Sequence, residues 1–273
     1  MFSRCGSLHP NLYSLMLIDD LIVLGRAVPE PLRDGRVTVC LAGWSEKLGF
    51  VRLYPTRHDM QFRRWDIIKV PVEKNNRDTR EESWKIAGSR DEWDTLTAKV
   101  EKVGRLDSNE GQRNLIGNLC DPSVTYINDQ RRSLGIIHPY VIQTYFRDNP
   151  KYGQLYQQGL PGFTQLGSVQ VKRDFPDEPR VKYTCPDGNE PDKRHDQQIL
   201  EWGFYEWLRK NPDNKEQVWE NAQFNREDTD IYFLIGNQAA HRNSFMVISV
   251  LRFPRGEITR SMFPLRRWVR DIE

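Results

Sequence analysis

The stretch RVTVCLAGWSEKLGFVRLYPTRHDMQFRRWDIIKVPVEK, residues 36–74, carries the clearest structural pattern of the chain. Apolar and polar residues alternate with a period of two in VTVCLAGW, in FVRLYP and in WDIIKVPVEK, which is typical of β-strands. The polar segment SEKLG between the first two runs indicates a hairpin turn. Three strands so close together favour a small β-barrel or a strongly bent antiparallel sheet.

The segments on either side of this stretch show other patterns. Leu17, Asp20, Leu21 and Leu24 follow helical spacing, and a glycine after them predicts a helix that ends at Gly25. Residues 75–95 are highly charged and predict a long loop, while residues 96–106 fit a helix or a strand equally well. Residues 109–148 look helical, and residues 149–178 are rich in Gly, Pro and Gln, which indicates a boundary or an insertion.

The last third of the chain has the most regular pattern. Residues 179–186 predict a short strand, and residues 195–210 and 214–224 predict helices. Residues 230–237 and 243–254 are apolar on both faces, as expected for two buried strands of a hairpin. We therefore expect an α+β fold with a small barrel-like domain over 16–105, a helical connector over 106–150 and a C-terminal α+β domain over 178–273.

Composition excludes several classes of protein. The 40 Lys and Arg residues nearly balance the 38 Asp and Glu residues, whereas dedicated duplex-DNA binders carry a clearer basic excess. The four cysteines are widely spaced, which predicts a reducing, cytoplasmic location and no disulfide scaffold. No apolar run is long enough to suggest a membrane span. The sequence also lacks the P-loop, dinucleotide-binding, nucleophile-elbow and zincin motifs, and we expect no cofactor.

The barrel segment carries the first candidate site, which is a mixture of cations and aromatic rings. Between Arg52 and Arg90 the chain has ten Lys or Arg residues and six Asp or Glu residues. Guanidinium groups neutralise phosphates and aromatic faces stack on bases, so this mixture suits nucleic acid. The candidate residues are Arg52, Tyr54, Arg57, Arg63, Arg64, Trp65, Arg77, Arg80 and Trp84. The alternative is a surface of ion pairs above tryptophans that belong to the core.

Arg52 is the most specific member of this set. It lies between Val51 and Leu53, so if Leu53 points into the barrel, Arg52 faces outward, onto a binding surface.

A second candidate site is a group of acid/base residues in the C-terminal part. His195, Glu201 and His241 form a catalytic site only if the hairpin turn packs beside the predicted helix. Cys185 and His195 alone are too few for a closed zinc site, which needs four ligands, so we expect no metal.

The motifs of the barrel segment resemble an uncharacterised bacterial family. The resemblance rests on Arg-Leu-Tyr-Pro at 52–55, on Asp78–Ser83 (D-x-R-x-E-S), and on a later Cys185, His195, Glu201-Trp202-Gly203 and Phe233–Asn237. It covers roughly residues 20–255. The chain departs from the family where members often have Asp-Trp-Glu, and it lacks a second cysteine near Cys185. The small barrel is also similar to PUA-like and OB-like nucleic-acid modules, by fold analogy.

These observations lead to three functional hypotheses. The first is a nucleic-acid-associated binding protein, in a bacterial defence or a DNA or RNA modification pathway. The second is a hydrolase that acts on nucleic acid or nucleotides through the acid/base residues. The third is a protein-interaction subunit whose partner binds Trp207, Trp219 or the tail at 265–273.

Overall fold

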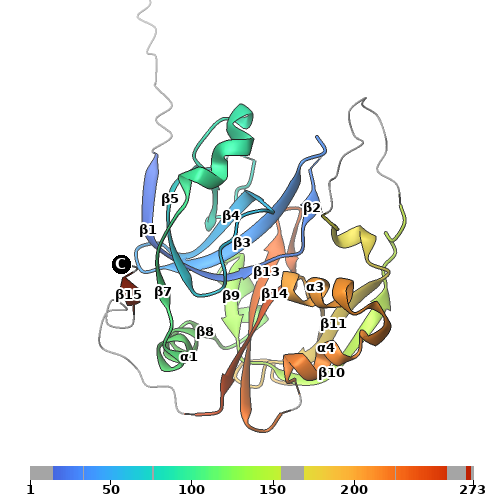
Figure 1. The fold of residues 1–273 in the computed structure, drawn as a ribbon. Coiled ribbons are helices and arrows are strands. Elements are labelled where there is room, and N and C mark those ends of the chain that lie inside the picture. Colours follow the sequence, from blue (N-terminus) through green and yellow to red (C-terminus); the bar gives the residue numbers. More distant parts are fainter. Residues whose placement is uncertain are drawn as a thin grey trace, which may run out of the picture.

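The computed structural model describes residues 15–32, 34–75, 77–154, 169–224, 226–256 and 269–271. As predicted, the fold is α+β. A barrel forms the N-terminal half, a long hairpin runs through the middle of the molecule, and short helices lie beside the last sheet (Figure 1).

Five strands close the N-terminal barrel. They pair in the order β1, β3, β4, β6 and β5, and β5 pairs again with β1. Their bounds are β1 (Met16–Arg26), β3 (Val37–Ser45), β4 (Gly49–Arg57), β5 (Asp66–Lys74) and β6 (Ser83–Ile86). β2 (Glu30–Pro31) pairs with β3, while β7 (Glu101–Leu106) and β15 (Val269–Asp271) extend the sheet beyond β5. The predicted small barrel is therefore confirmed.

β1 is a strand where helical spacing predicted a helix. Leu21 and Val23 pack inside the barrel, whereas Ile22 and Leu24 pack outside it against the second half of the chain. Because both faces are buried, the sequence lacks the alternation that marks a strand with one solvent-exposed face.

The second half contains two further sheets and most of the helical elements. The first sheet runs in the order β14 (His241–Pro254), β13 (Thr229–Gln238), β9 (Leu134–Ile137) and β8 (Cys120–Asp121). The second runs in the order β10 (Tyr140–Asp148), β11 (Asp177–Thr184) and β12 (His195–Gln198). The helical elements are η1 (Arg90–Lys99), α1 (Asn109–Asn118), α2 (Val124–Asp129), η2 (Lys172–Asp174), α3 (Trp202–Lys210), η3 (Pro212–Asn214) and α4 (Gln217–Ala222). The buried hairpin β13–β14 matches the prediction.

Three predicted segments differ from the structure in type. Residues 109–148 are helical only as far as α2 and then form β9 and β10. The predicted helix at 195–210 begins as β12, and only α3 is helical. The predicted loop at 75–95 contains β6, which completes the barrel by pairing with β4 and β5. In each case pairing with strands distant in sequence decides the structure, which local spacing does not report.

The two halves share a hydrophobic core. Leu24, Phe50 and Leu115 from the first half pack in one cluster with Leu134 and Leu234 from the second. Gly25 allows a close approach, since a Cβ atom at that position would lie 2.7 Å from the Cβ of Ser249 on β14. The barrel therefore rests directly on the hairpin sheet.

The surfaces suggested for a protein partner have little support in the described residues. Trp207 and Trp219 are partly buried against the C-terminal core, and most of the tail at 265–273 lies outside the described residues. In the described ranges we found no helix with an apolar stretch long enough to cross a bilayer.

Candidate functional site

A cavity of about 1110 Å³ lies where the barrel, the hairpin β13–β14 and the segments around Lys151 and Lys172 meet. Its lining includes Arg52 and Tyr54 of the Arg-Leu-Tyr-Pro motif and Arg80 of the second motif. Its lining combines apolar side chains with charged ones, as in many ligand sites.

The barrel topology brings the two sequence motifs together. β4 and β6 pair in parallel, with Arg52 opposite Ser83 and Leu53 opposite Trp84. The backbone N–H of Arg52 donates to the carbonyl of Glu82 at 2.7 Å. Motifs separated by more than 20 residues in sequence thus form one wall of the cavity.

Arg52 lies at the base of the cavity and connects the barrel to β9. Its side chain is 1% exposed, and its guanidinium donates to the Oγ of Ser133 at 2.8 Å and to the Ser133 carbonyl at 2.9 Å. Glu82 accepts from the backbone N–H and the Oγ of Ser133, at 2.7 and 2.9 Å. Gly236 leaves room for the guanidinium of Arg52, since a Cβ atom at position 236 would lie 2.9 Å from a guanidinium nitrogen. These hydrogen bonds therefore link the two halves of the chain.

Asp78 and Arg80 form a second buried charged group on the same wall. The two carboxylate oxygens of Asp78 accept from Arg80 at 2.8 and 2.5 Å, and Arg80 also donates to the carbonyl of Asn237 on the hairpin. Both side chains are 7% exposed. Burial opposes ionisation of Asp78, but the hydrogen bonds and charge of Arg80 outweigh it and lower the pKa of Asp78 to about 2.

We expect Asp78 to make the protein acid-sensitive. A carboxyl whose pKa falls on folding stabilises the native state above its unfolded pKa, and this contribution is lost as the pH falls through the native value. The free energy of unfolding should therefore drop by about 2 kcal/mol between about pH 4 and pH 2 through this group alone. The Asp78→Asn variant should be less stable at pH 7, because Arg80 loses its counterion. Its free energy of unfolding should also fall less on acidification than that of the unchanged protein. Urea unfolding at several pH values measures both; equal acid losses in the two proteins would contradict this assignment.

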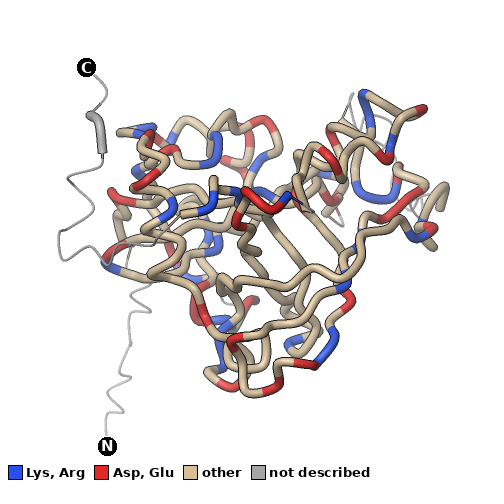
Figure 2. Tube along the Cα trace, turned by 90° about the horizontal axis from the view of Figure 1, so that it is seen from below, with Lys and Arg blue, Asp and Glu red and all other residues tan. Residues whose placement is uncertain are grey.

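The lining of the cavity is strongly cationic. Nine Lys or Arg residues line it, against four Asp or Glu residues: Arg36, Arg52, Lys74, Arg77, Arg80, Lys85, Arg90, Lys151 and Lys172, with Glu30, Asp34, Glu73 and Asp78. Elsewhere charges of both signs are interspersed along the chain (Figure 2). The positive excess is therefore local to the cavity, although the net charge of the chain is only +2.

The cavity also holds two aromatic rings and a thiol. Burial raises the pKa of Tyr54 to about 12. Burial also raises the pKa of the Cys40 thiol, although the charges of Arg52 and Arg80 oppose it. Both groups therefore stay neutral near pH 7. Trp93 lies under the guanidinium of Arg36, at 4.5 Å from the ring centroid. These groups suit stacking and hydrogen bonding better than nucleophilic attack.

The structure separates the predicted nucleic-acid-binding residues into two groups. Arg52, Tyr54, Arg77 and Arg80 line the cavity, whereas Arg57, Arg63, Arg64, Trp65 and Trp84 do not. The outward direction predicted for Arg52 is correct, but its predicted exposure is wrong, because β9 covers that face of the barrel.

Each residue of the second group has its own surroundings. Arg57 pairs with Asp59 and Asp94, and Arg64 pairs with Glu201. Trp65 is buried against Phe253, and the ammonium of Lys74 covers the ring of Trp84. Arg63 is exposed beside a second, shallower cavity.

His195, Glu201 and His241 do not form one site. His195 stacks on Tyr183, and six residues of mostly extended chain, about 20 Å, separate it from Glu201. Glu201 accepts from the backbone N–H of Val250 on β14. Phe245 lies about 15 Å from Val250 along this strand, and His241 lies farther along it still. The three side chains do not come together because residues 195–201 are extended instead of helical.

Several cavity residues were not found by sequence reasoning. Lys151 and Lys172 lie inside the stretch at 149–178, whose composition indicates a boundary or an insertion, and Trp93 lies in the predicted loop at 75–95. No local pattern marks any of them. Within the described residues, no group of three or more His, Cys, Asp or Glu side chains could hold a metal ion.

Comparison with protein families divides the chain into two domains of unknown function. DUF8758 matches residues 18–118, which include the barrel, and DUF8757 matches residues 127–267. Because the second match covers more than half of the chain, the protein belongs to the DUF8757 family. No curated protein matches the chain. The expected kinship with an uncharacterised family is thus confirmed at this level, with the barrel in the first domain.

Proposed function

We propose that the protein binds nucleic acid, and that one strand lies in the cavity between the barrel and the hairpin sheet. The excess of cations in the cavity lining carries this proposal. A phosphodiester backbone is the commonest extended anion that such a lining neutralises. The cavity is too small for a duplex but offers room for a stretch of one strand.

The aromatic rings support the same ligand. Tyr54 and Trp93 line the cavity together with the cations, and bases stack on aromatic rings whatever their sequence. A cavity that combines a charged rim with rings and apolar walls suits a ligand that has both phosphates and flat bases.

Arg77 is the residue most available for a phosphate. Arg80 is occupied by Asp78 and Lys85 by Glu73, whereas the exposed side chain of Arg77 makes no hydrogen bond or ion pair with the other described residues. An unpaired guanidinium on the rim binds an anion without first breaking an ion pair.

We expect Arg77→Glu to weaken the binding of single-stranded oligonucleotides about tenfold and to reduce the salt dependence. Fluorescence anisotropy with labelled single- and double-stranded DNA and RNA, at two salt concentrations, measures this. Arg63→Glu is the matched control, because it makes the same charge change on the barrel outside the cavity. Probes recovered afterwards are checked for cleavage.

Two results would overturn the proposal. One is the absence of salt-sensitive binding to every probe. The other is an equal loss of affinity in the Arg77→Glu and Arg63→Glu variants, which would place binding outside the cavity.

A further inference from the structure

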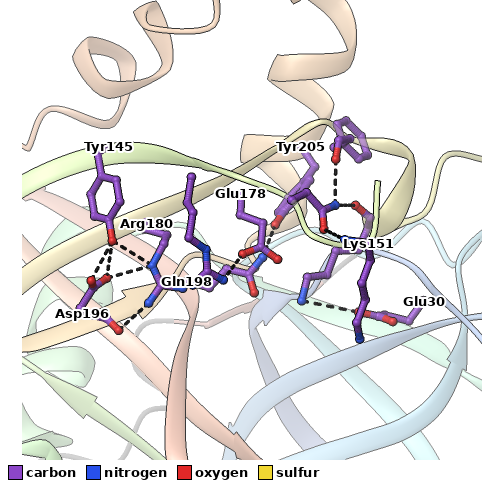
Figure 3. A network of polar contacts seen from close by, with 12 residues as sticks. Glu30, Tyr145, Lys151, Glu178, Arg180, Asp196, Gln198 and Tyr205 are labelled. Atoms are coloured by element: carbon purple, nitrogen blue, oxygen red, sulfur yellow. Dashed lines mark hydrogen bonds and ion pairs between the residues drawn. The ribbon is translucent and has the colours of Figure 1, made fainter. Parts of the chain in front are cut away.

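A pair of lysines stands at the C-terminal side of the cavity, away from the sequence motifs. Lys172 begins η2, and its backbone N–H donates to the carbonyl of Pro29, just before β2. Lys151 follows β10 and is drawn together with Glu30 in the polar network of Figure 3. Lys151, Lys172 and Glu30 all line the cavity.

The backbone around this pair is held firmly. Asn149 is 6% exposed, and its side-chain amide donates to the carbonyls of Lys172 and Phe175, at 3.1 and 2.8 Å. Its Oδ1 accepts from the backbone N–H of Lys151 at 3.0 Å. One asparagine therefore fixes the chain at both lysines, so the two ammonium groups start from a preorganised backbone.

Lys172 lacks a close counterion. Its side chain is 18% exposed, and its nearest carboxylate contact is Glu30, at 3.9 Å. Glu178 is already paired with Arg147. Burial lowers the pKa of Lys172; Glu30 and Glu178 oppose this shift, while the positive charges of Lys151 and Arg147 reinforce it. Three cations thus share two carboxylates, and the local charge is incompletely neutralised.

We propose that Lys172 and Lys151 form a phosphate-binding subsite of the cavity. An anion placed between two ammonium groups offsets the cost of burying Lys172, and the partly water-excluded wall strengthens the attraction. The subsite deepens the proposed function, on which it rests as far as the phosphate belongs to a nucleic-acid strand. A free phosphate compound has the same chemistry.

Competitive acetylation measures occupancy of the subsite residue by residue. The folded protein is treated with trace acetic anhydride, with and without inorganic phosphate, in sodium chloride of equal ionic strength, and each lysine is quantified by mass spectrometry. Acetylation of Lys172 should slow about tenfold when phosphate is at ten times its Kd. Lys210, which is exposed on α3, is the internal control and should not change.

Two variants and a second probe complete the test. In Lys172→Met, phosphate should no longer protect Lys151, whereas in Lys210→Met the protection should persist. A single-stranded oligonucleotide is then used in place of phosphate. Oligonucleotide binding that leaves Lys172 unprotected overturns the subsite and leaves the proposed function standing. Protection by phosphate without any oligonucleotide binding supports the subsite and overturns the nucleic-acid function. An unchanged rate for Lys172 with both probes, or equal protection by chloride, overturns the subsite.

Discussion

Replacing Arg52 with methionine should lower the free energy of unfolding by about 3–5 kcal/mol. The substitution keeps much of the side-chain volume but removes both hydrogen bonds to Ser133. It also removes one of the positive charges that act on the carboxylate of Glu82, which is 9% exposed. A buried carboxylate that loses a cation is far more costly than the absence of both charged groups.

Urea denaturation tests this expectation, and two comparisons make it specific. Arg63→Met removes the same charge from an exposed position and should change stability by less than about 0.5 kcal/mol. The double variant Arg52→Met/Glu82→Gln should recover part of the loss, because an amide oxygen still accepts from Ser133 without carrying charge. A loss below about 1 kcal/mol in the single variant would contradict the structural role of Arg52.

The second large effect is expected at Glu201, which we first considered as a catalytic group. Its carboxylate accepts from Arg64 at 2.6 Å and from the backbone N–H of Val250 at 2.5 Å. Arg64 also donates to the carbonyl of Val250 at 3.0 Å. Glu201→Leu removes an acceptor and isolates a guanidinium, and we expect a loss of about 2–3 kcal/mol.

Glu201→Gln separates the hydrogen bonds from the charge. The amide oxygen still accepts from Val250 or Arg64, so the loss should be about 1 kcal/mol smaller than for the leucine variant. Urea midpoints of the two variants, compared at equal denaturant slopes, give this difference directly. Equal losses would show that the negative charge alone stabilises this contact. Nearly unchanged stability in both variants would contradict a structural role for Glu201.

The sequence predicted the parts of the fold in which one strand face differs from the other. β3, β4 and β5 alternate clearly, because one face of each packs inside the barrel. β1 was mistaken for a helix because both of its faces are buried, and β6 was missed because four residues are too few to show a period. Long-range pairing determines both strands, and a single sequence carries no record of it.

The candidate site, like the fold, was predicted only in part. The two motifs that line the cavity were visible in the sequence, the first because it combines a charged residue with a strand pattern and the second because it is rich in charged residues. The direction of Arg52 could be derived from alternation, but the sheet that covers it could not. Lys151 and Lys172 stand on irregular chain, where no periodicity indicates which residues face inward.

The core shared by the two halves has a consequence for how the two matched domains are inherited. The outer face of the barrel is apolar where it meets the hairpin sheet, through side chains such as Leu24 and Phe50. A protein that carried the first domain alone would expose this face and be prone to aggregate. It would need either polar substitutions there or another polypeptide to cover the surface. The DUF8757 domain thus covers an apolar face of the neighbouring domain. We therefore expect the two domains to be inherited together as one unit.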